Sequence, residues 1–288
     1  MIRFYLFVVL EYVLNILHLN KKMQVQAEKK QRSPILNNEV IVHTHEWSGY
    51  AFERHKVIKY TSNKFLCGLR FHFERLQQYK GIRPIRNILT VSDLDASYSE
   101  RLRCEKFFDK SAEIYGVPNR GMDFGGYGFV VKNLIAGDNK YIFLTNTSVN
   151  ADSAIFIDEY IDIFSAHNNL GLLGISYSSK VYQSLIRNNY TPHVQSFFLL
   201  TTTDILREIT TANGGVFPGE NEDYKLSIIR LGEAKLSQLA VTLGYDIGII
   251  NEEGTLQLLP VQKDSSLVDG DYRLFVKKPN FINRIINE

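Results

Sequence analysis

The hydrophobic residues of the chain fall into two kinds of segment that alternate. Short apolar runs that end in polar residues, at 40–42, 87–91 and 141–144, predict buried parallel strands. Between them, apolar residues recur at helical spacing over 66–79 and 127–135. Because strands that alternate with helices form parallel sheets, this pattern predicts one α/β domain with a mostly parallel sheet flanked by helices.

The same pattern continues through the second half of the chain and then fades. It predicts a helix or lid over 155–165, a strand over 170–175, a loop that enters a buried strand over 191–200, helices over 204–211 and 223–243, and an edge strand over 256–261. The polar stretch 20–38 has the composition of a linker. We therefore expect an N-terminal apolar helix with a linker (1–38), an α/β domain (39–260) and a C-terminal tail (261–288).

The segment 4–17 is strongly apolar and is followed by Lys21 and Lys22. It is shorter than a membrane-spanning helix, and Glu11 and Asn15 interrupt it. Three alternatives stay open: a signal or signal-anchor segment, an amphipathic helix at a membrane interface, or a helix packed on the domain. The pattern favours the last two, and the second would make the protein peripheral at a membrane surface.

Charge and cysteine content narrow the classes of function. A net charge of +2 over 288 residues provides no basic field that would favour nucleic acid as a partner. Cys67 and Cys104 form no metal-binding or redox motif. They favour a reducing, cytoplasmic compartment, although two cysteines also permit a single disulfide.

The stretch 118–128 is rich in glycine and carries one carboxylate, Asp123. Four glycines let a backbone approach a ligand closely and adopt positive φ, but their spacing does not match G-x-G-x-x-G. Two interpretations stay open: a loop that approaches a ligand, or glycines that only permit tight packing of a helix on a strand. The next predicted strand ends in Asn146, Thr147 and Ser148, and in open α/β sheets ligands bind at that end.

Three blocks of sequence resemble the rhamnan-synthesis-F-like group of GT-A-type glycosyltransferases. Residues 119–127 (Asn-Arg-Gly-Met-Asp-Phe-Gly-Gly-Tyr) are similar to that group's Asn-x-Gly-x-Asp-Phe-Gly-x-Tyr loop. Residues 144–148 resemble its strand end, and 193–198 (His-Val-Gln-Ser-Phe-Phe) resemble its His-x-Gln-Ser-Tyr-Phe block. The resemblance implies a GT-A-like fold and an inverting transferase that moves a hexosyl or deoxyhexosyl group from a nucleotide-sugar donor to a polysaccharide or glycan acceptor.

The resemblance also assigns roles to individual residues. It places Asp93 and Asp95 at the nucleoside, Asn119, Gly121, Asp123, Gly125 and Gly126 at the ribose or sugar of the donor, Asn146, Thr147 and Ser148 at the diphosphate, and His193, Gln195 and Ser196 on the acceptor side. Glu233 is expected to be the catalytic base, with Asp223, Glu222 and Glu220 as rivals. Ordinary roles are open as well: Asp95 as the N-cap of a helix that runs through Phe108, His193 as a hydrogen-bonded strand residue and Glu233 as a solvated carboxylate.

The end of the first predicted strand is also rich in polar and aromatic residues. His43 and His45 would share one face of the strand, with Glu46 on the other, so a zinc site would need ligands that the sequence does not supply nearby. Strand-end polar residues are the favoured interpretation. Trp47 and Tyr50 would then offer surfaces on which a nucleobase stacks.

The resemblance implies Mg²⁺ or Mn²⁺ at the donor diphosphate, yet this chain departs from the metal pattern. The predicted strand end at 146–148 has no Asp-x-Asp, and the next carboxylate is Asp152. Asp152 or Asp123 could supply the charge, amide and hydroxyl oxygens could suffice, the enzyme could work without a metal, or it could be inactive. The alternative function is therefore a non-catalytic, GT-A-like protein of glycan assembly or nucleotide-sugar binding.

Overall fold

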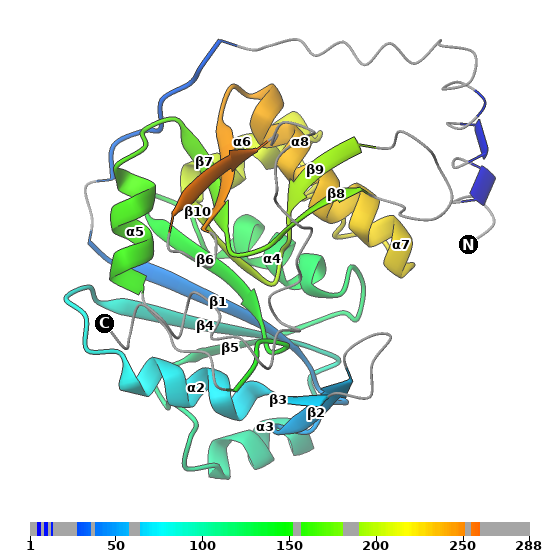
Figure 1. The fold of residues 1–288 in the computed structure, drawn as a ribbon. Coiled ribbons are helices and arrows are strands. Elements are labelled where there is room, and N and C mark those ends of the chain that lie inside the picture. The colour runs from blue at the N-terminus through cyan, green and yellow to red at the C-terminus, as the bar shows by residue number, and fades with distance from the viewer. Residues whose placement is uncertain are drawn as a thin grey trace.

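The computed structural model describes residues 5, 6, 9, 10, 13, 28–35, 38–57, 64–151, 157–180, 190–250 and 255–259. Eight strands form the central sheet (Figure 1): β1 (Val40–Trp47), β4 (Ile85–Ser92), β5 (Glu113–Val117), β6 (Tyr141–Asn146), β7 (Leu170–Gly174), β10 (Phe198–Thr202), β11 (Asp246–Ile250) and β12 (Leu256–Leu259). Their spatial order is β12-β11-β7-β10-β6-β1-β4-β5. Within this sheet only β10 and β12 run antiparallel to their neighbours, so the predicted, mostly parallel sheet is confirmed.

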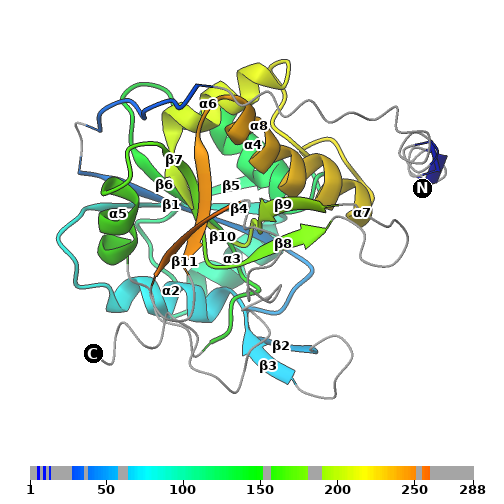
Figure 2. The same ribbon diagram turned by 45° about the horizontal axis from the view of Figure 1, so that its top comes forward.

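Helices cover both faces of the sheet (Figure 2). They are α2 (Leu69–Gln78), α3 (Ala96–Cys104), α4 (Asp123–Asn133), α5 (Ile157–Ser165), α6 (Thr203–Ala212), α7 (Lys225–Ile228), the π-helical turn η1 (Ile229–Ala234) and α8 (Lys235–Thr242). Alternate strand residues serve the two faces: Ile41 packs in one core with α4, α6 and α8, whereas Val40 and Val42 pack in another with α5. A third core joins α2 and α3 to Leu89 and Val91 of β4.

Two small hairpins lie outside the sheet, and the hydrophobic pattern did not predict them. One pairs β2 (Arg54–Val57) with β3 (Lys64–Cys67), directly after β1. The other pairs β8 (Tyr177–Lys180) with β9 (Tyr190–Val194). The first hairpin brings Arg54 back toward the end of β1, which matters for the site described below.

The strand order places a topological switch point in the middle of the sheet. From β1 the chain moves outward to β4 and β5, and then returns to β6 on the other side of β1. In open α/β sheets, ligands bind outside the carboxyl ends of the strands at such a point. In this sheet, the switch point lies at the carboxyl ends of β1 and β6.

Three sequence-based boundaries need correction. Helix α4 begins at Asp123 rather than Tyr127, so Gly125 and Gly126 belong to the helix and not to a loop. Helix α3 ends at Cys104, four residues before the predicted end. The helical segment predicted over 223–243 begins at Lys225 and contains a π-helical turn.

The predicted strands and helices at 170–175, 204–211 and 256–261 are confirmed by β7, α6 and β12. Most of 4–17, Asp152 and the tail 261–288 lie outside the described residues, and the three segment boundaries stay predictions. Over the described part of the chain, no helix combines the length and the apolar character needed to cross a bilayer.

Candidate functional site

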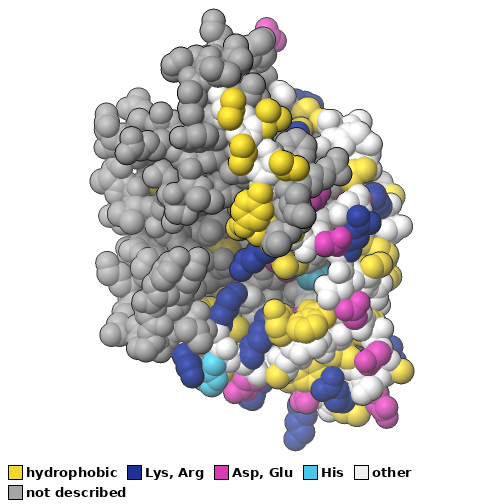
Figure 3. All heavy atoms as spheres, turned by 90° about the vertical axis from the view of Figure 1, so that its right-hand side faces the viewer, with side chains coloured by type: hydrophobic (Ala, Val, Ile, Leu, Met, Phe, Trp, Pro, Cys, Tyr) yellow, Lys and Arg dark blue, Asp and Glu magenta, His cyan; other side chains and the backbone are white. Residues whose placement is uncertain are grey.

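The carboxyl ends of the central strands bring the predicted polar residues to one edge of the sheet. The parallel register pairs Trp47 of β1 with Ser92 of β4, and His45 of β1 with Asn146 of β6. Glu46, the residues after Ser92 and the residues after Asn146 therefore share this edge. Figure 3 looks onto this side of the molecule, where Lys and Arg side chains line one side of a hollow in the surface.

Asp123 and Asn146 form the centre of this edge. The Asn146 amide nitrogen Nδ2 donates a hydrogen bond to Asp123 Oδ2 across 2.6 Å, and its Oδ1 accepts one from the backbone N–H of Ser148 at 2.9 Å. Asp123 lies in the first turn of α4, where the helix dipole favours a negative charge. Gly121 (φ 75°) and Met122 (φ 48°) make the sharp turn that leads into the helix.

The glycines of α4 let the helix approach β1 and β4 closely. A Cβ atom at Gly126 would overlap His45 Nδ1 and Thr90 Oγ1, and one at Gly125 would overlap the carbonyl oxygen of Arg120. Gly126 therefore permits tight packing of α4 on β1 and β4, and Gly125 permits close approach to the turn at Arg120, while a role of either glycine at a ligand stays a prediction. By this packing the two glycines position Asp123 at the sheet edge.

Glu233 reaches the same region through Ser196. Ser196 donates two hydrogen bonds to Glu233 Oε1, from Oγ at 2.8 Å and from the backbone N–H at 3.2 Å. The Asn146 N–H donates to the carbonyl oxygen of Phe197 at 3.2 Å, and the Tyr127 hydroxyl donates to that of Ser196 at 2.9 Å. Because β10 is antiparallel to β6, its first residues lie at the carboxyl edge of the parallel strands. Because β10 runs in this direction, Ser196 contacts Glu233 while the neighbouring Phe197 contacts Asn146, the partner of Asp123.

Asp93 and Asp95 have different environments. Asp95 is the N-cap of α3, and its Oδ1 accepts a hydrogen bond from the backbone N–H of Tyr98 at 2.6 Å, which confirms the capping role. Asp93 is exposed with φ 55°, and its Oδ2 accepts from Trp47 Nε1 at 3.4 Å. Trp47 and Tyr50 are 39% and 44% exposed and lie edge to face, with ring centroids 5.0 Å apart.

The other predicted site residues have different surroundings. Asp223 has a 74% exposed side chain that faces Arg120 Nε at 3.7 Å. His193 is buried in β9, and Gln195 Oε1 accepts a hydrogen bond from Ser176 Oγ at 2.5 Å. Asn119 is exposed on the turn before α4.

Arg54, which the sequence interpretation did not single out, joins the ends of β1 and β6. Its Nη1 donates to Glu46 Oε2 at 3.2 Å and its Nη2 donates to Thr147 Oγ1 at 2.7 Å. The guanidinium lies over the ring of Tyr50, 4.1 Å from the centroid. Burial raises the pKa of Glu46, and the charge of Arg54 opposes that shift. No periodic pattern pointed to Arg54, because a short surface hairpin buries few apolar residues.

Three buried histidines, His43, His45 and His72, lie beneath the strand-end site. His43 Nε2 and His45 Nδ1 lie 2.8 and 3.0 Å from Thr90 Oγ1, and His72 Nε2 lies 2.6 Å from Thr44 Oγ1. Burial lowers the pKa of all three, that of His72 to about 3. These rings are therefore neutral at pH 7 and act as hydrogen-bonding core residues.

Among the described residues, the donor set at this edge does not fit a divalent metal held by the protein alone. Asp123 is the carboxylate beside Asn146, and its Oδ2 already accepts a hydrogen bond. Across the described residues, no three His, Cys, Asp or Glu side chains gather as metal ligands. Mg²⁺ and Mn²⁺ prefer several oxygen ligands in defined geometry.

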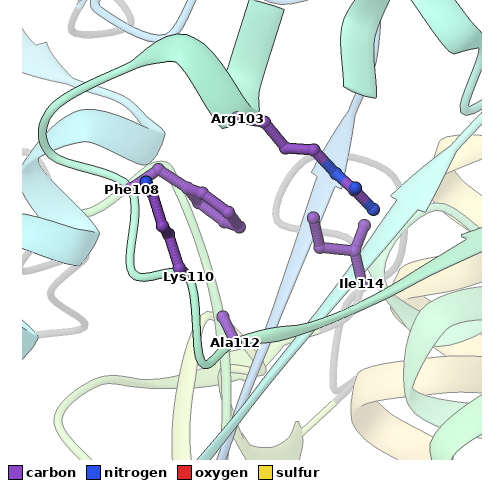
Figure 4. A pocket seen from close by; sticks show the side chains of 5 residues that line it. All are labelled: Arg103, Phe108, Lys110, Ala112 and Ile114. Atoms are coloured by element: carbon purple, nitrogen blue, oxygen red, sulfur yellow. The ribbon is translucent and has the colours of Figure 1, made fainter. Parts of the chain in front are cut away.

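A cavity of about 440 Å³ lies at the other end of β5. It is lined by Arg103, Phe108, Lys110, Ala112 and Ile114. Figure 4 shows Arg103 extending from the end of α3 toward Ile114, with Phe108 and Lys110 on the opposite side. Because Ala112 and Ile114 are at the amino end of β5, this cavity is separate from the strand-end site.

No family model and no curated protein matches this sequence. Among solved structures, the chain is similar to a 4-diphosphocytidyl-2C-methyl-D-erythritol synthase from Anaerococcus prevotii, with a TM-score of 0.43 and 10% identity over 87% of this chain and 97% of that one. It is also similar to the mannosyltransferase PcManGT from Pyrobaculum calidifontis, in complex with GDP-Man and Mn²⁺, with a TM-score of 0.39 and 10% identity over 83% of this chain and 61% of that one. Because these likenesses are remote, the function proposed below is based on the residues of this chain.

Proposed function

We propose that the protein is a glycosyltransferase that uses a nucleotide-sugar donor. The observation that carries the proposal is the pair of Asp123 and Asn146 at the topological switch point, joined to Glu233 through Ser196 and Phe197. Acidic, amide and hydroxyl side chains at the carboxyl ends of β1 and β6 suit a polyhydroxylated, phosphorylated ligand. The resemblance of the blocks at 119–127, 144–148 and 193–198 to the rhamnan-synthesis-F-like group supports the same function.

The nucleoside would bind beside the end of β1. Trp47 and Tyr50 expose aromatic surfaces there, and Asp93 lies within hydrogen-bonding distance of Trp47 Nε1. Aromatic faces stack on nucleobases, and an exposed carboxylate accepts hydrogen bonds from ribose hydroxyls. The donor sugar would then lie toward Asp123, with the diphosphate at 146–148.

Glu233 would act as the general base of an inverting transfer. Its carboxylate takes the proton from an acceptor hydroxyl while that oxygen forms a bond to the anomeric carbon and the nucleoside diphosphate leaves. Both hydrogen bonds from Ser196 go to Oε1, which orients the carboxylate, so the proton would be taken by Oε2. The acceptor is proposed to be a polysaccharide or glycan.

A thermal-shift panel of UDP-, GDP-, dTDP- and CMP-sugars, with and without Mn²⁺, tests the proposal. A ligand that binds only the folded state raises the Tm by mass action, by an amount that grows with ligand concentration. We expect one nucleotide class to raise the Tm, and slow donor hydrolysis with that class. Failure of every donor to bind would contradict the proposal. Binding without hydrolysis or transfer to any glycan would favour the non-catalytic alternative.

A further inference from the structure

The Arg54 guanidinium occupies the switch point itself. Arg54 belongs to the β2–β3 hairpin, whereas its partner Glu46 lies near the end of β1 and its partner Thr147 comes directly after β6. The Arg54 side chain is 17% exposed and that of Glu46 only 2%, so the cation lies between the buried carboxylate and the surface. Figure 3 shows basic side chains beside the hollow on this face.

A nucleoside diphosphate brings at least two negative charges to this edge, and those charges need a cation. Asp123 cannot neutralise them, and the described residues provide no three-ligand metal group. A guanidinium has five N–H donors in a planar fork that matches phosphate oxygens. The contacts with Glu46 and Thr147 use two of the five.

The contacts of Arg54 hold it ready for such a ligand. Glu46 fixes Nη1, Thr147 fixes Nη2, and the ring of Tyr50 supports the guanidinium plane. Thr147 is also one of the residues that the sequence resemblance assigns to the diphosphate. A side chain held in this way loses little further freedom when a ligand binds.

We propose that Arg54 binds the diphosphate of the donor and supplies the positive charge that Asp-x-Asp enzymes obtain from a metal ion. This inference rests on the proposed function, because it concerns the same site. Arg54 would then contact Glu46 on one side and the diphosphate on the other. The competing role for Arg54 is purely structural, as the ion pair that ties the hairpin to β1.

Isothermal titration calorimetry distinguishes diphosphate binding by Arg54 from a purely structural role. The wild type, Arg54→Gln and Arg86→Gln are titrated with UDP, GDP and dTDP and with the matching nucleosides. The ratio of the nucleoside Kd to the diphosphate Kd measures what the phosphates contribute. Arg86→Gln is the matched control, because Arg86 also pairs with a carboxylate, Glu113, but at the amino end of β4.

We expect Arg54→Gln to lower this ratio by roughly tenfold to a hundredfold, the range for a hydrogen bond to a charged group, with nucleoside affinity unchanged. Arg86→Gln should keep the wild-type ratio. An unchanged ratio in Arg54→Gln, or an equal loss of nucleoside and diphosphate affinity, would overturn the inference. If Arg54→Gln does not fold, Arg54→Met keeps the apolar stem against Tyr50 and is judged by the same ratio. A wild type that binds no nucleotide would instead contradict the proposed function.

Discussion

The amide of Asn146 donates a hydrogen bond to the carboxylate of Asp123 across 2.6 Å, and so joins the end of β6 to the first turn of α4. The amide is oriented in turn by the backbone N–H of Ser148. The carboxylate therefore has one defined position at the switch point of the sheet. Further predictions for the site and its supporting core follow from this geometry.

Asp123→Asn should remove donor binding at a small cost in stability. The substitution keeps the shape of the side chain but removes the charge at the helix N-terminus and the charged acceptor for Asn146, worth about 1–2 kcal/mol together. We expect the donor-dependent rise in Tm to disappear and hydrolysis to fall roughly tenfold or more. Asp138→Asn is the control, because Asp138 is exposed at the amino end of β6. A wild-type response in Asp123→Asn would remove this residue from the site.

Glu233→Gln should lower kcat and leave donor affinity nearly unchanged. Loss of a general base typically costs about 10²–10⁴ in rate, while the amide oxygen can still accept hydrogen bonds from Ser196. The measurement is nucleoside diphosphate release from the donor identified by thermal shift. Glu159→Gln, an exposed residue of α5, is the control. Full activity in Glu233→Gln together with its loss in Asp223→Asn would move the base to Asp223.

Gly126→Ala should destabilise the protein, although alanine normally stabilises a helix by about 1 kcal/mol relative to glycine. The added methyl group would overlap His45 and Thr90, and overpacking of this kind costs about 1–3 kcal/mol. Urea unfolding gives the change in free energy. In the double variant with His45→Ala, the methyl group gains space, so the cost of Gly126→Ala should shrink. Equal costs in both backgrounds would show that His45 does not limit the packing of α4.

Stability should fall with acid because of the buried histidines. The pKa of His72 is lowered to about 3 in the fold against 6.5 for a free side chain, so between these values the unfolded state binds more protons. The free energy of unfolding should then decrease as the pH falls, by up to about 1.4 kcal/mol per pH unit for each such histidine. Urea unfolding at about pH 7 and about pH 5 measures this slope.

His72→Gln should make that slope shallower, whereas His167→Gln, at an exposed position, should not. The glutamine variant lacks the imidazole that takes up a proton when the protein unfolds in acid, but it keeps a polar group near Thr44. A slope that is the same in the wild type and in His72→Gln would contradict this account of the acid sensitivity.

The order of strands and helices was predictable because buried parallel strands and amphipathic helices have distinct hydrophobic periods. The N-cap at Asp95 was predictable for a similar reason, since capping depends on local residues. The direction of β10 was not, because a strand has the same pattern whichever way it runs. Yet that direction places Ser196 beside Glu233.

The glycine-rich stretch shows a second limit. The ligand-loop and packing interpretations of Gly125 and Gly126 both stayed open, because the composition of a flexible turn and that of a closely packed helix are alike. The packing of Gly126 against His45 and Thr90 depends on residues far away in the sequence and is seen only in the structure. Arg54 had no local signal at all, since its partners Glu46 and Thr147 are 8 and 93 residues away in the chain.

The π-helical turn that carries Glu233 has a consequence for how this site can change. Such a turn holds one residue more than the α-helical turn it replaces, so deletion of a single residue can restore a regular helix. Leu231 of this turn is 40% exposed, so its deletion would take no buried side chain from the core. Because the turn lies between α7 and α8, the deletion would shift the register of one helix against the other and so change how Ser196 and Glu233 face each other. Loss of one codon would thus change the contact between Ser196 and the proposed base.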